Sequence, residues 1–107
     1  MEILEQDVPL RLDDQGAVRV GETRVLFDLV VRSYLRGDTP EDIVREYPTL
    51  SLADTYGAIA YYLQHRDQVE EYLQRREEQA TEVRNKLQEA GIAVDADVFL
   101  DREETSE

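Results

Sequence analysis

Hydrophobic and polar positions change their spacing along the chain, and each change predicts a new element. The stretch PLRLDDQGAVRV alternates apolar and polar residues around Asp-Asp-Gln-Gly. This pattern predicts two short strands joined by a tight turn, with Gly16 at a position of positive φ. An isolated hairpin is marginally stable in water, so its apolar side chains need the following helices as packing partners. These side chains are Leu10, Leu12, Val18 and Val20.

Helical patterns follow the hairpin. RVLFDLVVRSYLRG is apolar nearly all round a helix, which predicts a central, largely buried helix that ends at Gly37. A shorter helix comes next, because Thr39 as N-cap, Pro40 at the first helical position and acids in the first turn form a start signal. Pro48 marks its end, and Ser51 is the expected N-cap of a third helix.

The third helix, within YPTLSLADTYGAIAYYLQHR, has apolar positions at helical spacing. We expect one stripe to face the core: Leu52, Tyr56, Ile59, Ala60 and Leu63. Other positions then lie outside the core: Ser51, Ala53, Asp54, Thr55 and Tyr62. Gly57 costs roughly 1 kcal/mol relative to Ala in mid-helix, and it indicates close approach of another backbone.

Residues 66–90 contain neither Gly nor Pro and are densely charged. Their apolar or small positions are Val69, Leu73, Ala80, Val83, Leu87 and Ala90. Steps of four and three alternate if Arg76 takes the missing position, which predicts a helix with a narrow apolar seam that needs a partner. No breaker separates this helix from the third one, so the sequence leaves open whether they are continuous.

The segment after Gly91 carries apolar residues among acids. It is too short and too charged to fold alone, so it is disordered, docked on the domain, or folded on a partner. The expected fold is therefore mainly α: a small N-terminal β-hairpin, a three-helix bundle, a long C-terminal helix and an acidic tail. We place a first domain at residues 1–65, and the C-terminal helix and tail at residues 66–107.

Charge argues against a stand-alone nucleic-acid binder. The chain has 25 acidic and 12 basic residues, and its net charge of −13 repels phosphates at long range. The acids are unevenly spread, because residues 15–47 hold six acidic and five basic residues, whereas residues 88–107 hold seven acidic and one basic residue. The first domain is thus locally near neutral, and DNA binding stays open.

Candidate chemistry is sparse. The chain has no cysteine and a single histidine, His65, and it shows no phosphate-binding glycine loop and no calcium loop. Adjacent carboxylates such as Glu70 and Glu71 do not share a helix face. We therefore expect a protein that is not an enzyme and that needs no metal or cofactor. The sequence has no apolar run of bilayer length and no signal-peptide pattern, so we expect a cytoplasmic protein without membrane contact.

A buried helix, a second helix, a tight turn and a third helix form the layout of a helix-turn-helix bundle. The first turns of a DNA-reading helix usually carry Arg, Lys, Asn or Gln, which are absent from residues 51–56. Any DNA contact would therefore go mainly to phosphates. The candidate ligands are Arg24, Arg32, Arg36, Arg45, Thr49, Ser51 and Thr55.

The run from Val20 to Tyr62 resembles the domain of unknown function 433 (DUF433) family. The resemblance is carried by Gly21, Thr23, Arg24, Gly37, Pro40, Glu41, Ile43, Tyr47, Pro48, Leu50, Ala58, Ala60, Tyr61 and Tyr62. It extends over roughly residues 8–73 without a break in spacing. The chain departs from the family pattern at Val25-Leu26 and at Thr55-Tyr56-Gly57.

The resemblance implies a homeodomain-like fold in a VapB-like antitoxin, encoded beside a PIN-like RNase toxin. The first domain would bind promoter DNA as a homodimer, and the C-terminal segment would wrap the toxin. The corresponding partner-binding residues are Val69, Leu73, Val83, Leu87, Val98, Phe99, Leu100 and Arg102. The alternative is an interaction or scaffold module that binds protein only, which the lack of base-reading side chains favours.

Overall fold

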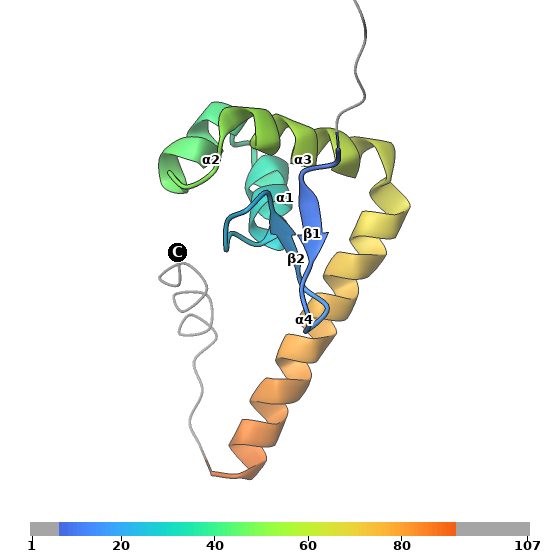
Figure 1. The fold of residues 1–107 in the computed structure, drawn as a ribbon. Helices are drawn as coiled ribbons and strands as arrows, with labels where there is room; N and C mark the ends of the chain where they lie inside the picture. The colour runs from blue at the N-terminus through green and yellow to red at the C-terminus, as the bar shows by residue number, and fades with distance from the viewer. Residues whose placement is uncertain (1–6, 92–107) are drawn as a thin grey trace, which may run out of the picture. The chain divides into compact units, whose positions relative to one another are not determined.

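The protein is mainly helical, with a small N-terminal hairpin, as the sequence predicts. The computed structural model describes residues 7–91, and the expected acidic tail lies outside them (Figure 1). In chain order the elements are β1 (Leu10–Leu12), β2 (Val18–Val20), α1 (Phe27–Arg36), α2 (Pro40–Glu46), α3 (Leu52–Gln64) and α4 (Arg66–Glu89). The chain divides into two compact units, Met1–Gln64 and His65–Glu107.

The hairpin pairs β1 with β2 in antiparallel register, with Leu10 opposite Val20 and Leu12 opposite Val18. Gly16 has a φ of 83°, which confirms the expected positive φ in the turn. Val20 is fully buried, and β2 contacts both α1 and α3. Leu12 is 71% exposed, so the expectation that it packs on the helices is wrong. Leu12 ends β1 beside the turn, whereas Val20 ends β2 on the way to α1.

The ends of the first two helices follow the predicted signals. α1 stops at Gly37, whose φ of 109° is left-handed and whose N–H donates to the carbonyl of Tyr34. At the start of α2, the Thr39 hydroxyl accepts from the Asp42 N–H at 3.1 Å, and the Asp42 carboxylate accepts from the Thr39 N–H at 3.1 Å. This reciprocal capping box satisfies two amide donors that would otherwise lack a partner in the helix.

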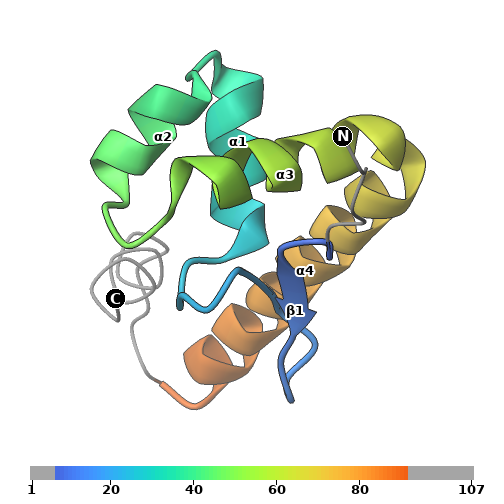
Figure 2. The ribbon, with the colours of Figure 1, turned by 45° about the horizontal axis from the view of Figure 1, so that its top comes forward.

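The core of the first unit lies where α1, α2 and α3 pack together, with β2 against α1 and α3 (Figure 2). The largest side chains with almost no exposure are Tyr62, Phe27, Ile43, Val20, Val25, Val30 and Val31. Two edge-to-face aromatic pairs join α1 to α3, because the rings of Phe27 and Tyr61, and those of Tyr34 and Tyr62, have centroids 6.3 Å apart. Such contacts add specific geometry to apolar burial, and they fix how α3 lies on α1.

The buried face of α3 differs from the predicted one. Thr55, Ala58, Ile59 and Tyr62 are buried, so the expectation that Thr55 and Tyr62 lie outside the core is wrong. Of the predicted stripe only Ile59 is buried. Leu52, Tyr56 and Leu63 are 43%, 49% and 42% exposed, and Ala60 is exposed as well. α3 is apolar on most sides, so a second stripe at helical spacing competes with the first. The aromatic pairs with α1 select the stripe that contains Tyr62.

Gly57 allows a close approach, but the neighbour is a side chain and not a backbone. A Cβ at this position would lie 2.8 Å from Cγ of Pro9, closer than carbon atoms approach without displacement. Glycine therefore gives room for the proline ring that precedes β1. The predicted close approach is confirmed, and its expected partner is wrong.

α3 and α4 are separate helices, which answers the question that the sequence left open. α3 ends at Gln64, and His65 has a non-helical conformation with φ −134° and ψ 45° before α4 begins. α4 spans 24 residues and is followed by Gly91, whose φ is 79°. Within residues 7–91, none of the helices combines the length and apolarity that crossing a bilayer requires.

Candidate functional site

The arginines predicted to bind phosphate fall into two groups. The Arg36 guanidinium donates to the Asp38 carboxylate at 2.8 Å and lies 3.8 Å from that of Glu46. The hydrogen bond to Asp38 raises the pKa of Arg36 above its ordinary value. Arg45 pairs with Asp42 at 3.1 Å. These two cations are already offset by neighbouring carboxylates, which weakens their attraction for a phosphate.

Arg24 and Arg32 form the second group. Both side chains are exposed, Arg24 in the turn before α1 and Arg32 on α1 itself. Neither has an ion-pair partner among the residues that the structure describes. Of the four predicted arginines, these two are therefore the ones available to an anionic ligand.

The hydroxyl residues predicted near the start of α3 do not act as one set. Ser51 is exposed, and its Oγ accepts from the Asp54 N–H at 3.0 Å, as an N-cap does. Thr49 is exposed in the preceding turn. Thr55 is fully buried, and its hydroxyl donates to the Ser51 carbonyl at 2.9 Å. The prediction that Thr55 contacts DNA is wrong, because its side chain faces the core.

Four exposed residues of α3 form an apolar surface, and the sequence pattern assigns all four to the core. We call Leu52, Tyr56, Ala60 and Leu63 the α3 stripe. Asp54 is the one charged residue among the 13 residues of α3. A helix that reads DNA needs donors on its outer face, whereas an uncharged apolar stripe suits contact with protein.

One acidic residue borders the α3 stripe. The Tyr56 hydroxyl donates to both oxygens of the Glu41 carboxylate, at 2.7 Å and 3.1 Å. The contact links α2 to α3 and orients the Tyr56 ring. It also places a negative charge beside the helix that would have to approach the DNA backbone, which disfavours that approach.

In the second unit, α4 carries the helical part of the predicted partner-binding set. Val83 is 44% exposed, and Leu73 and Leu87 are partly exposed. Val69 is only 3% exposed, so its assignment to a partner surface is wrong. The seam pattern treats all its positions alike, which is why it failed to separate Val69 from the others. The remaining members, Val98, Phe99, Leu100 and Arg102, lie outside the described residues.

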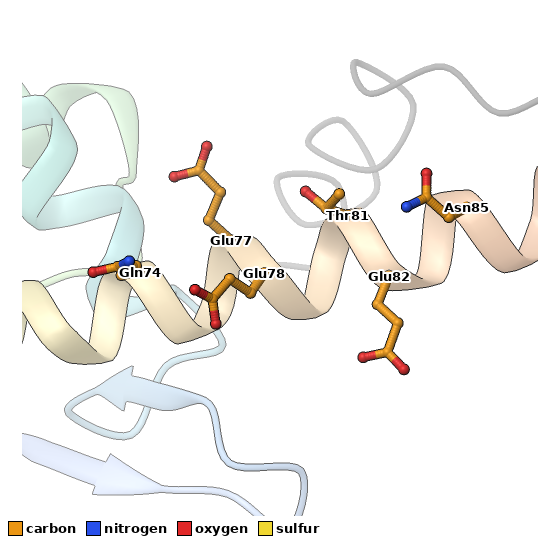
Figure 3. Close-up of a pocket in the computed structure, with 6 residues that line it drawn as sticks. All are labelled: Gln74, Glu77, Glu78, Thr81, Glu82 and Asn85. Atoms are coloured by element: carbon orange, nitrogen blue, oxygen red, sulfur yellow. The ribbon is translucent and has the colours of Figure 1, made fainter.

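A shallow, open depression of about 430 Å³ follows the polar side of α4. It is lined by Gln74, Glu77, Glu78, Thr81, Glu82 and Asn85. Figure 3 shows Glu78 and Glu82 projecting to one side of the helix and Glu77, Thr81 and Asn85 to the other, so their polar groups do not converge on one point. Within residues 7–91, no group of three or more His, Cys, Asp or Glu side chains is placed to hold a metal ion.

Part of the chain that carries these surfaces matches a protein family. Residues 15–62 match the DUF433 family, described as a protein of unknown function. The match confirms the predicted resemblance from the β1–β2 turn to Tyr62, a shorter span than residues 8–73. No curated protein and no solved structure matches the chain. The DUF433 match includes Arg24, Arg32 and most of the α3 stripe, and α4 lies beyond it.

Proposed function

We propose that the protein is an antitoxin-type protein that acts by binding a PIN-like RNase toxin through α4 and the following segment. One observation carries the proposal: the otherwise polar α4 exposes apolar side chains along one stripe. Val83 is 44% exposed, and Leu87, one helical turn further on, is partly exposed. The family resemblance supplies the class of partner.

An amphipathic helix binds protein by laying its apolar face into a groove of the partner. Ala80, Val83 and Leu87 follow one another at steps of three and four, so they lie on one face of α4. Seven acidic and five basic residues in 65–91 keep the rest of the helix solvated. Because this apolar face of α4 is small, we expect the segment that follows α4 to add to the contact with the toxin.

Charge complementarity supports the role of that segment. A PIN-like nuclease has a basic substrate groove around acidic metal-binding residues. Asp95, Asp97 and Asp101 complement a basic groove, and Arg102 matches the carboxylates within it. Apolar Val98, Phe99 and Leu100 lie between these charges in the sequence, as in segments that fold on a partner.

Co-purification tests the proposal. The full chain is expressed with the product of the neighbouring gene, and complex formation and RNase inhibition are measured. We expect Val83→Glu to weaken both, whereas Asn85→Glu, on the polar side of α4, leaves both unchanged. We expect deletion of residues 92–107 to reduce inhibition further. Unchanged binding and inhibition by Val83→Glu and by the deletion variant would rule out this function.

DNA-backbone binding by the first unit is a second candidate, and the availability of Arg24 and Arg32 favours it. In this form the α1–α2–α3 segment is a homeodomain-like helix-turn-helix that contacts promoter phosphates as a dimer, with little base reading. A mobility-shift assay at low salt, using the gene's own upstream region, tests it. We expect the double variant R24A/R32A to show no mobility shift, whereas the control variant Arg45→Ala still shifts the DNA. No shift at micromolar protein would favour the protein-only interaction module.

A further inference from the structure

The α3 stripe belongs to the first unit and is not used by the proposed toxin contact. We infer that it is covered by the α3 stripe of a second copy of this chain, with the two helices antiparallel. Three of its side chains are large and apolar, and each is more than two-fifths exposed: Leu52 at 43%, Tyr56 at 49% and Leu63 at 42%. Their spacing places them along one side of the helix.

The order of large and small residues along the stripe fits this partner. The middle of α3 is residue 58, from which Tyr56 and Ala60 are both two residues away. Leu52 precedes the middle by six residues, and Leu63 follows it by five. A two-fold axis near residue 58 therefore brings Tyr56 of one copy opposite Ala60 of the other, and Leu52 opposite Leu63. At about 1.5 Å per residue, the midpoints of these two pairs differ by roughly 1 Å along the helix.

In this arrangement the large Tyr56 ring of one copy lies over the small Ala60 of the other, and Leu52 faces Leu63. Facing large and small side chains interdigitate without leaving a void. A parallel arrangement would instead place Tyr56 against Tyr56 and Ala60 against Ala60. The antiparallel arrangement also brings the N-terminal end of each α3 near the C-terminal end of the other, which their helix dipoles favour.

Charge supports a second copy as the occupant. Two chains with a net charge of −13 repel each other, so they associate most readily where the surface carries no charge. The side chains of the α3 stripe meet this condition, because the single charge on α3, Asp54, is not among them. Its carboxylate instead lies toward Gly21, where an added Cβ would be 2.5 Å from Asp54 Oδ2. The Glu41 carboxylate borders the stripe, where it accepts a hydrogen bond from the Tyr56 hydroxyl.

Light scattering on the full chain, coupled to size exclusion, tests the inference. We expect the mass of two chains for the wild type, and a dimer that tightens with added salt because salt screens the repulsion between copies. Leu52→Glu and Leu63→Lys should each raise the dissociation constant by about tenfold or more. In the double variant L52E/L63K, the introduced carboxylate of one copy faces the introduced ammonium group of the other, so the dimer should return. These charges also suit the helix ends.

A variant on α4 serves as the control, because Val83 is as exposed as Leu52 but belongs to the second unit. We expect Val83→Lys to leave the dimer intact, and circular dichroism should show every variant folded. A wild-type chain that stays monomeric overturns the inference. So does a dimer that Val83→Lys dissociates and Leu52→Glu does not, and so does a double variant that stays monomeric.

Discussion

The Tyr56 hydroxyl in α3 donates to the Glu41 carboxylate in α2, with an oxygen–oxygen distance of 2.7 Å to Oε2. This hydrogen bond with Glu41 raises the pKa of Tyr56 above its ordinary value of 10.0, and desolvation and the charge of the carboxylate add to the effect. The two residues thus join neighbouring helices on an exposed side of the first unit.

We expect Glu41→Gln to lower the pKa of Tyr56 toward 10.0, because the amide removes the negative charge beside the phenol. Phenolate absorbance measured against pH follows the change, and the difference between the wild type and Tyr56→Phe isolates this tyrosine from the other five. The hydrogen bond that raises this pKa stabilises the fold at pH values below 10. That stabilisation is lost as pH rises through the raised pKa. Identical titration curves for Tyr56 in both backgrounds would contradict the assignment.

The orientation of α3 predicts opposite outcomes for two neighbouring substitutions. Thr55→Lys places a charge where the native side chain is fully buried, so we expect a loss of about 3 kcal/mol or more in unfolding free energy. Ala53→Lys puts the same side chain on an exposed position and should change stability by less than ~0.5 kcal/mol. Chemical denaturation measures both. Similar losses for the two variants would mean that α3 is oriented differently.

Local signals predicted much of the fold, because each depends on few residues. Thr39 and Asp42 form the capping box at the start of α2 from residues that are only three positions apart. Gly37 and Gly16 adopt positive φ because glycine lacks a Cβ. The DUF433 match confirmed the resemblance that rested on the spacing of glycines, prolines and tyrosines. These features need no knowledge of what packs against them.

The facing of α3 could not be predicted in the same way. Its helix is apolar on most sides, so the choice between two stripes depends on the rings of Phe27 and Tyr34 in another helix. Judged by size and apolarity alone, Tyr56 is a better core residue than Thr55. A buried threonine looks unfavourable from sequence, but its hydroxyl finds the Ser51 carbonyl one turn earlier, which removes the cost of burying it. The α3 stripe was assigned to the core for the same reason, because size and apolarity do not show which side of the helix another helix covers.

Gly57 provides a test of the contact with Pro9. Gly57→Ala should gain about 1 kcal/mol of helix propensity, but its new Cβ would lie 2.8 Å from the Pro9 ring, so we expect net destabilisation in thermal or chemical unfolding. In a Pro9→Ala background the ring is absent, and the same substitution should become neutral or stabilising. This double-mutant cycle separates steric conflict from propensity. If Gly57→Ala stabilises both backgrounds equally, the ring does not restrict this position.

The capping box at α2 predicts a pH dependence in the acidic range. The Asp42 carboxylate accepts from the Thr39 backbone N–H and bonds to the Thr39 side chain, with Arg45 nearby, and these contacts hold its pKa below the ordinary 3.8. Because the folded pKa is lowered, the stabilisation is complete above the ordinary value and is lost as pH falls through the lowered one. We expect Asp42→Asn to be less stable than the wild type at neutral pH and to lose less stability below about pH 4. Urea unfolding at several pH values measures this, with Asp14→Asn on the exposed hairpin turn as the control. A wild type and an Asp42→Asn variant whose stabilities fall in parallel below that pH would show that the lowered pKa does not contribute to folding.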